Sequence, residues 1–226
     1  YLDFLGHTLT LAAIAAVLTA LFALLLGFVK RLPGSGRKSR FGFSSVRLAT
    51  LGYALPGSGL AVGIMPSSTW IDRHVLQALN IPLLLMGSVL ALIMAYLTRF
   101  LAVAYAPVDA GMDSIRPGMI EAARSLGVKP AGLLTRVYIP MLRPGLLTAL
   151  ILVFVDVMKE LPATLIMRPF NFDTLAVTAH NYAADERLAE AAIPALSIVV
   201  VGLLPVLILS RMISSGAKHD AKDGNE

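Results

Sequence analysis

Long apolar runs constrain this chain more than any other feature. They cover approximately residues 5–29, 48–65, 81–97, 146–167 and 193–213. A helix needs about 20 apolar residues to cross the hydrocarbon core of a bilayer. The hydrophobic fraction of 57%, with only 15% charged residues, also lies far outside the range of soluble proteins. The sequence therefore predicts an all-α integral membrane protein with about five transmembrane helices.

Two of the predicted spans are interrupted by residues that disturb helices. Pro56, Gly57 and Gly59 lie inside the second run, and Pro162 lies inside the fourth. Within a membrane, a helix break is tolerated only where neighbouring protein satisfies the freed backbone groups. We therefore expect the second span to be bent or broken, and free backbone carbonyls to lie near Pro162.

Lysine and arginine are distributed unevenly between the connecting segments. Residues 30–47 and 99–143 hold six each and the chain from residue 211 holds three, so 15 of the 19 fall on one predicted side. Basic residues concentrate in cytoplasmic loops. The pattern predicts an N-terminus outside and a cytoplasmic C-terminus in a multi-pass protein of a bacterial inner membrane. Residues 1–215 form the membrane domain in this reading, and 216–226 form a polar cytoplasmic tail.

The cytoplasmic segment 99–143 contains signals for two short helices joined by an elbow. Pro117 suits the first turn of a helix, and Gly127 suits the left-handed position that follows a helix end. Pro130 likewise opens a second helix, which we expect to end before Pro140.

The elbow carries a spaced motif. It resembles the loop of the membrane permeases of bacterial ABC importers, in which Glu-Ala-Ala is followed by three residues, Gly, nine residues and Ile-x-Leu-Pro. The corresponding positions here are Glu121, Ala122, Ala123, Gly127, Val137, Ile139 and Pro140. The resemblance implies the type I (MetI-like) permease fold and a cytoplasmic coupling helix that docks on an ATP-hydrolysing subunit. The residues it implies for coupling are Glu121, Ala122, Ala123, Gly127 and Pro140.

A second stretch narrows the resemblance within that family. Residues 155–177, VDVMKELPATLIMRPFNFDTLAV, look like the corresponding segment of ferric iron permeases. Those permeases often consist of two similar halves in one chain, and this sequence resembles the second half. An N-terminus outside the membrane without an obvious export signal agrees with that expectation. Thiamine, phosphonates and polyamines remain alternative cargoes, because the elbow motif is shared by their importers.

The resemblance also implies the partners. They are a dimer of ATP-binding subunits, the other permease half, a periplasmic binding protein and the lipid membrane. ATP hydrolysis is expected in a separate subunit, since the string PGSGRKS does not have the spacing of a phosphate-binding loop. No catalytic residues, cofactor, metal site or nucleic-acid surface are predicted in this chain.

Charged residues within the fourth predicted span allow two interpretations. The residues concerned are Asp156, Lys159, Glu160 and Pro162. Their spacing places the three charges on one helical face, where they would line the translocation path with oxygen ligands suited to ferric iron. Alternatively, they form a structural ion-pair network that holds a broken helix. In a protein of another class, a proton-coupled secondary transporter, the same charges would relay protons.

Overall fold

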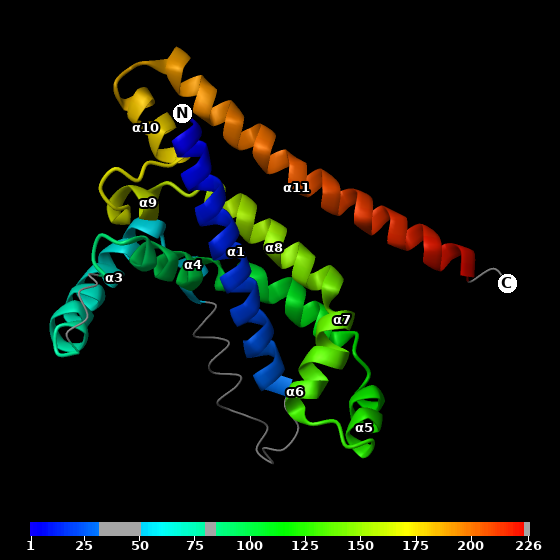
Figure 1. Ribbon diagram of the computed structural model, residues 1–226. Helices are drawn as coiled ribbons and strands as arrows, with labels where there is room; N and C mark the ends of the chain where they lie inside the picture. The colour runs from blue at the N-terminus through cyan, green and yellow to red at the C-terminus, as the bar shows by residue number, and fades with distance from the viewer. Residues whose placement is uncertain (32–50, 80–84, 224–226) are drawn as a thin grey trace.

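The computed structural model describes residues 1–31, 51–79 and 85–223, and these residues form helices and connecting turns without any strand. The long helices are α1 (Leu2–Arg31), α4 (Val89–Asp113), α8 (Arg143–Met158) and α11 (Leu188–Asp223). The shorter elements are η1 (Leu51–Ala54), α3 (Gly57–Ile71), η2 (Asp72–Leu76), α5 (Pro117–Ser125), α6 (Pro130–Leu133), η3 (Leu134–Tyr138), α7 (Ile139–Met141), α9 (Pro162–Met167) and α10 (Leu175–Ala184). Figure 1 shows their arrangement. The prediction of an all-helical membrane fold is confirmed.

The core is a bundle in which α1, α4 and α8 pack against one another. The buried face of α1 is a stripe of small residues: Ala12, Ala15, Ala16, Thr19, Ala20, Ala23 and Gly27. Small residues allow helix backbones to approach closely, which is the main source of helix association within a bilayer. The approach is close at Gly27, where a β-carbon would lie 2.8 Å from the side chain of Met112.

Three of the described helices are long and apolar enough to cross a membrane: Leu2–Arg31, Val89–Asp113 and Leu188–Leu207. A fourth crossing is available if the pair 130–141 and 143–158, bent by 75°, counts as one span. The expected second span is indeed broken, because α3 begins only after Pro56 and is 15 residues long. Residues 48–50 and 81–84 of the predicted spans lie outside the described residues.

The prediction that the third span ends at Arg99 is wrong. Helix α4 continues to Asp113, so the first part of the predicted loop 99–143 belongs to a spanning helix. The side chain of Arg99 is only 20% exposed and forms an ion pair with Glu160, which allows a charge to lie within an apolar helix. The connecting segment after this helix therefore starts near residue 114. At the other end of the chain, α11 continues into the predicted polar tail as far as Asp223.

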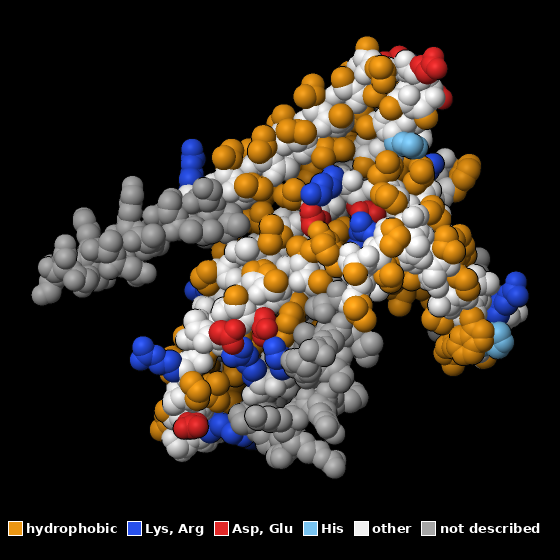
Figure 2. Space-filling view, turned by 180° about the vertical axis from the view of Figure 1, so that it is seen from behind, with side chains coloured by type: hydrophobic (Ala, Val, Ile, Leu, Met, Phe, Trp, Pro, Cys, Tyr) orange, Lys and Arg blue, Asp and Glu red, His pale blue; other side chains and the backbone are white. Residues whose placement is uncertain are grey.

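Helix α11 packs on α10 and α8 but leaves much of its surface uncovered. Its exposed residues include Ile193, Leu196, Val199, Val200, Leu203, Leu204 and Leu207. Figure 2 shows hydrophobic side chains along this helix. An apolar surface of this kind is stable against lipid or a further protein segment rather than against water.

The beginnings of α1 and α10 are tied together at the end of the bundle that carries the N-terminus (Figure 1). The Thr8 hydroxyl accepts a hydrogen bond of 2.9 Å from the backbone N–H of Leu175. The His7 ring stacks on Phe172 with their centroids 4.2 Å apart. Thr174 caps α10 by accepting a hydrogen bond from the Val177 N–H at 3.4 Å. These contacts give Phe172 and Thr174 structural roles in joining α1 to α10 and in capping α10.

Candidate functional site

Helix α5, which carries the Glu-Ala-Ala motif, projects from the bundle at the end opposite the N-terminus (Figure 1). It begins with Arg116 as the N-cap and Pro117 in the first turn, as the sequence predicted. Proline is favoured there because its fixed φ suits the helix and its missing N–H would be unpaired in any case. None of the nine residues of α5 is buried in this chain. Ile120 and Ala123 are half-buried against the core, and the other seven residues are exposed within the described part of the chain, so one face of the helix is accessible to another protein.

The end of α5 is a hydrogen-bonded stop built around Gly127. This residue has φ +80°, in the left-handed region that was predicted for it. Its N–H donates to the Arg124 carbonyl at 2.9 Å, and the next N–H, from Val128, donates to the Ala123 carbonyl at 3.1 Å. This pair of bonds is a Schellman motif. Val128 and Ala123 also pack against the hydrophobic core, so the stop anchors the elbow to the bundle.

The predicted coupling residues share this projection. Glu121, Ala122 and Gly127 are exposed, and Ala123 is half-buried. Beneath the helix lies a pocket of about 290 Å³ between α5, Arg31 at the end of α1, and Tyr138. Pro140 does not lie on α5. It lies in α7, two residues after Tyr138.

The second helix of the elbow does not end before Pro140, as the sequence suggested. Helical structure continues from Pro130 to Met141 through the π-helical turn η3. That turn shifts the hydrogen-bond register, so Pro140 occupies the first turn of the next segment, where a proline is tolerated. The sharp change of direction comes after Met141, where the two parts of the bent span meet at 75°.

Asp156 and Lys159 form an ion pair, as their spacing predicted. The Lys159 Nζ lies 2.9 Å from the Asp156 Oδ1, and the side chains are 63% and 19% exposed respectively. They lie at the end of α8, where the helix stops at Met158 and Lys159 is the C-cap. The Lys159 side chain of this ion pair is therefore exposed.

The side chain of Glu160 is buried and does not join the Asp156–Lys159 ion pair. Its side chain is 6% exposed, and its Oε2 lies 3.3 Å from the Nε of Arg99 on α4. Its Oε1 accepts a hydrogen bond of 3.2 Å from the Ala163 N–H at the start of α9. Arg99 also donates from Nη1 to the Leu55 carbonyl at 3.1 Å. One buried ion pair therefore connects α4, α9 and the segment before α3.

The backbone at the first residue of α3 approaches this ion pair very closely. A β-carbon on Gly57 would lie 2.5 Å from Glu160 Oε1 and 2.9 Å from Arg99 Nη1. Only a residue without a side chain fits there. Gly57, identified in the sequence as a helix breaker, is therefore also required by packing.

The prediction that Asp156, Lys159 and Glu160 share one helical face is wrong. Helix α8 ends before Glu160, so its side chain turns to Arg99 instead of joining the other two. Sequence reasoning missed Arg99, which it interpreted as the end of a span. The available signal was the apolar run that continues from Phe100 beyond Arg99. The contacts of Glu160 fit the structural interpretation, whereas a role in the path stays a prediction for all four residues.

Lys159→Met is expected to change the free energy of unfolding by less than about 1 kcal/mol, because exposed ion pairs contribute little. Thermal unfolding of the protein in lipid nanodiscs measures this change. A matched control is Arg187→Gln, which breaks the exposed Arg187–Glu190 ion pair at a similar spacing. A loss of several kcal/mol for Lys159→Met alone would contradict the assignment of this pair to an open surface.

Comparison with protein families places these features in context. A family model described as "Binding-protein-dependent transport system inner membrane component" matches residues 23–219. The Fe(3+)-transport system permease protein FbpB 2 of Haemophilus influenzae is 27% identical over 165 residues, which cover 73% of this chain and 31% of that protein. The putative 2-aminoethylphosphonate transport system permease protein PhnV of Salmonella typhimurium is 28% identical over 131 residues, which cover 58% of this chain and 49% of that protein. The matched part is thus less than half the length of these relatives.

Solved structures agree on the fold. A bacterial alginate ABC transporter, in complex with an alginate-bound periplasmic protein, matches with a TM-score of 0.73 at 15% identity, covering 94% of this chain and 77% of that chain. The MetNI methionine ABC transporter in an inward-facing conformation matches with a TM-score of 0.70 at 17% identity, covering 95% and 94%. At these identities the likeness establishes the fold only.

Proposed function

Because the chain belongs to the family of binding-protein-dependent transport system inner membrane components, we propose that it lines a translocation path and couples that path to ATP-hydrolysing subunits through α5. The observation that carries this proposal is a helix with no buried residue, held by Pro117 and Gly127 at one end of a membrane-spanning bundle. Ile120 and Ala123 pack on the bundle and fix the position of the helix, while its outer face stays exposed. An exposed face on a helix held in this way suits contact with another protein.

The cargo we propose is ferric iron. The support is the similarity to Fe(3+)-transport permeases, which covers 73% of this chain, and the resemblance of residues 155–177. Asp156, Lys159 and Pro162 remain candidates for the path, with carboxylate and carbonyl oxygens as hard ligands. Binding there would have to be weak, since tight binding would slow release.

The proposed assembly contains more than this chain. It comprises a second permease half, a dimer of ATP-binding subunits and a periplasmic binding protein in an inner membrane, with α5 on the cytoplasmic side. ATP would bind only to the partner subunits. The alginate transporter with its bound periplasmic protein supports this composition through its shared fold.

The mechanism we propose is alternating access. Closure of the ATP-binding subunits around ATP moves α5, and the bundle then opens toward the loaded binding protein. Hydrolysis reverses the movement. The chain contributes a path and a mechanical link, which corresponds to rigid-body rocking of packed helices. The family match argues against the alternative of a proton-coupled secondary transporter.

Glu121→Ala is expected to reduce uptake of radioactive ferric iron several-fold, because Glu121 is exposed on α5 and offers the partner subunit a charged contact. Uptake is measured in iron-starved cells that carry the full-length transporter, with its abundance in the membrane checked by immunoblot. Glu190→Ala serves as a control for loss of one exposed carboxylate outside α5, near the start of α11. Wild-type uptake by the Glu121 variant would contradict the coupling role. If the unmodified transporter takes up no more iron than a strain that lacks it, the proposed cargo is wrong.

A second cargo, 2-aminoethylphosphonate, is favoured by one observation. The matched segment is 28% identical to the PhnV relative, about as similar as it is to the ferric iron relative at 27%. Competition between unlabelled 2-aminoethylphosphonate and ferric iron in the same uptake assay distinguishes the two.

A further inference from the structure

The cytoplasmic end of α1 lies between the two arms of the elbow that carries α5. The first arm is the end of α4, which leads into α5 within a few residues. The second arm is η3, which follows α6 and returns toward α8. Residues 27–31 of α1, which we name the α1 joint, contact both arms.

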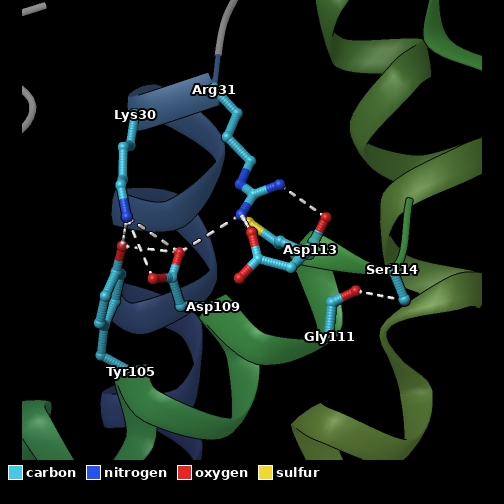
Figure 3. Close-up of polar contacts among 8 residues, drawn as sticks. Lys30, Arg31, Tyr105, Asp109, Gly111, Asp113 and Ser114 are labelled. Carbon is cyan, nitrogen blue, oxygen red and sulfur yellow. Dashed lines mark hydrogen bonds and ion pairs between the residues drawn. The ribbon is translucent and has the colours of Figure 1, made fainter. Parts of the chain in front are cut away.

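Arg31 binds the first arm. Its Nη1 donates to the Met112 carbonyl at 2.6 Å, and its Nη2 contacts the carboxylate of Asp113. Nη2 also lies 3.7 Å from Asp109 Oδ1. Figure 3 shows these contacts at the end of α1. Asp113 is the last residue of α4, so Arg31 binds the chain shortly before α5 begins.

Lys30 adds contacts to α4 that begin one turn before Asp113. Its Nζ donates to both carboxylate oxygens of Asp109, at 3.1 and 3.0 Å, and to the Tyr105 hydroxyl at 3.0 Å (Figure 3). The Tyr105 hydroxyl donates in turn to Asp109 at 3.0 Å. The Lys30 and Asp109 side chains are 29% and 26% exposed, so water screens this cluster only in part.

Phe28 and Gly27 complete the joint through apolar contacts. The Phe28 ring meets the Tyr138 ring of η3 edge to face, with centroids 5.2 Å apart, and both side chains are buried. At Gly27 a β-carbon would lie 2.8 Å from Sδ and Cε of Met112, so α1 packs directly on the end of that side chain. Arg31 and Tyr138 also line the pocket beneath α5. The joint therefore touches the elbow before α5, after it and below it.

We propose that the α1 joint transmits movement of α5 to the membrane-spanning bundle, with Arg31 as the positioning residue. This inference rests on the proposed function, since it assumes that α5 is moved by an ATP-hydrolysing partner. Charged hydrogen bonds and close packing on both arms make α1 move with the elbow as one body, because packed helices shift as units and deform little. Without Arg31, the elbow would move while α1 stays behind.

The test uses an introduced thiol as a reporter, since the chain contains no cysteine. The complete transporter, with cysteine-free partner subunits and Asp3→Cys at an exposed position in the first turn of α1, is placed in proteoliposomes with its binding protein. Maleimide labelling rates are compared without nucleotide and with ATP plus vanadate. We expect the two rates to differ in this reference protein. Adding Arg31→Gln should make the two rates equal, whereas basal ATP hydrolysis, measured without the binding protein, should be retained, because the substitution removes a contact outside the ATP site.

Two further variants separate transmission from folding. Arg31→Lys keeps a cation beside Asp113 and should restore part of the difference between the rates, whereas Arg187→Gln, at the distant exposed ion pair, should leave it unchanged. The proposal is overturned if Arg31→Gln preserves the difference. It is also overturned if Arg31→Gln loses basal ATP hydrolysis and the difference together, because Arg31 would then only support the folded elbow. Equal rates in the reference protein, despite ATP hydrolysis, would instead show that the proposed coupling function fails.

Discussion

Glu160→Ala is expected to destabilise the protein by about 3–5 kcal/mol, the cost of breaking a buried ion pair and leaving one charge without a partner. Glu160 is 6% exposed, and its carboxylate lies against both the Arg99 guanidinium and the N–H of Ala163. Removing it takes away the counter-charge of the guanidinium, which among the described residues would keep its hydrogen bond to the Leu55 carbonyl and its position over the Phe100 ring. It also removes the side chain that satisfies the start of α9.

Thermal and chemical unfolding in lipid nanodiscs measure this loss, with the Trp70 fluorescence as a probe. The double variant Arg99→Leu/Glu160→Leu is the matched control, because an apolar pair of similar volume removes the unpaired charge. We expect it to recover most of the stability lost in the single variant. A single variant as stable as the wild type, or a double variant no better than the single one, would show that this ion pair does not hold α4, α9 and the segment before α3 together.

Gly127→Pro is expected to abolish both transport and binding-protein-stimulated ATP hydrolysis, while the protein still inserts into the membrane. Proline has φ fixed near −65°, whereas Gly127 has φ +80°. Proline also lacks the N–H that Gly127 donates to Arg124, and it disfavours the near-helical φ −82° and ψ 8° of the preceding Leu126. Together these conflicts cost about 3 kcal/mol or more. The hydrogen bonds that end α5 would then break, and the Glu-Ala-Ala motif would no longer be held in a fixed orientation.

Alanine at two glycines distinguishes a local strain from a loss of coupling. Gly127 and Gly87 both have positive φ, +80° and +74°, and a β-carbon would meet nothing within 4 Å at either position. Each change to alanine therefore adds only backbone strain, about 1–2 kcal/mol for a left-handed residue. Gly127→Ala should lower coupled ATP hydrolysis and uptake in part, and Gly87→Ala should leave both near wild type. Equal effects of the two substitutions, or full transport by Gly127→Pro, would refute a special role for the end of α5.

The parts that could be read from the sequence are those with local causes. Apolar length determines which segments suit a bilayer, and proline and glycine determine where α5 begins and ends, since the hydrogen bonds of a cap join residues within six positions. For the same reason the Asp156–Lys159 pair was predictable from its spacing. The predicted cargo and the roles of individual residues in the path have a different basis, namely resemblance to known permeases.

The tertiary structure decided which distant residues meet. Arg99 looked like the end of a span, and only the position of Glu160 beyond the end of α8 explains why that charge lies inside α4. Gly57 looked like a simple helix breaker until the ion pair was found against its backbone. The contacts of Arg31 and Phe28 with the two arms of the elbow had no sequence signal either. Such pairings depend on how the helices pack, and helix packing depends on the shape of whole surfaces, such as the stripe of small residues on α1, rather than on any short pattern in the chain.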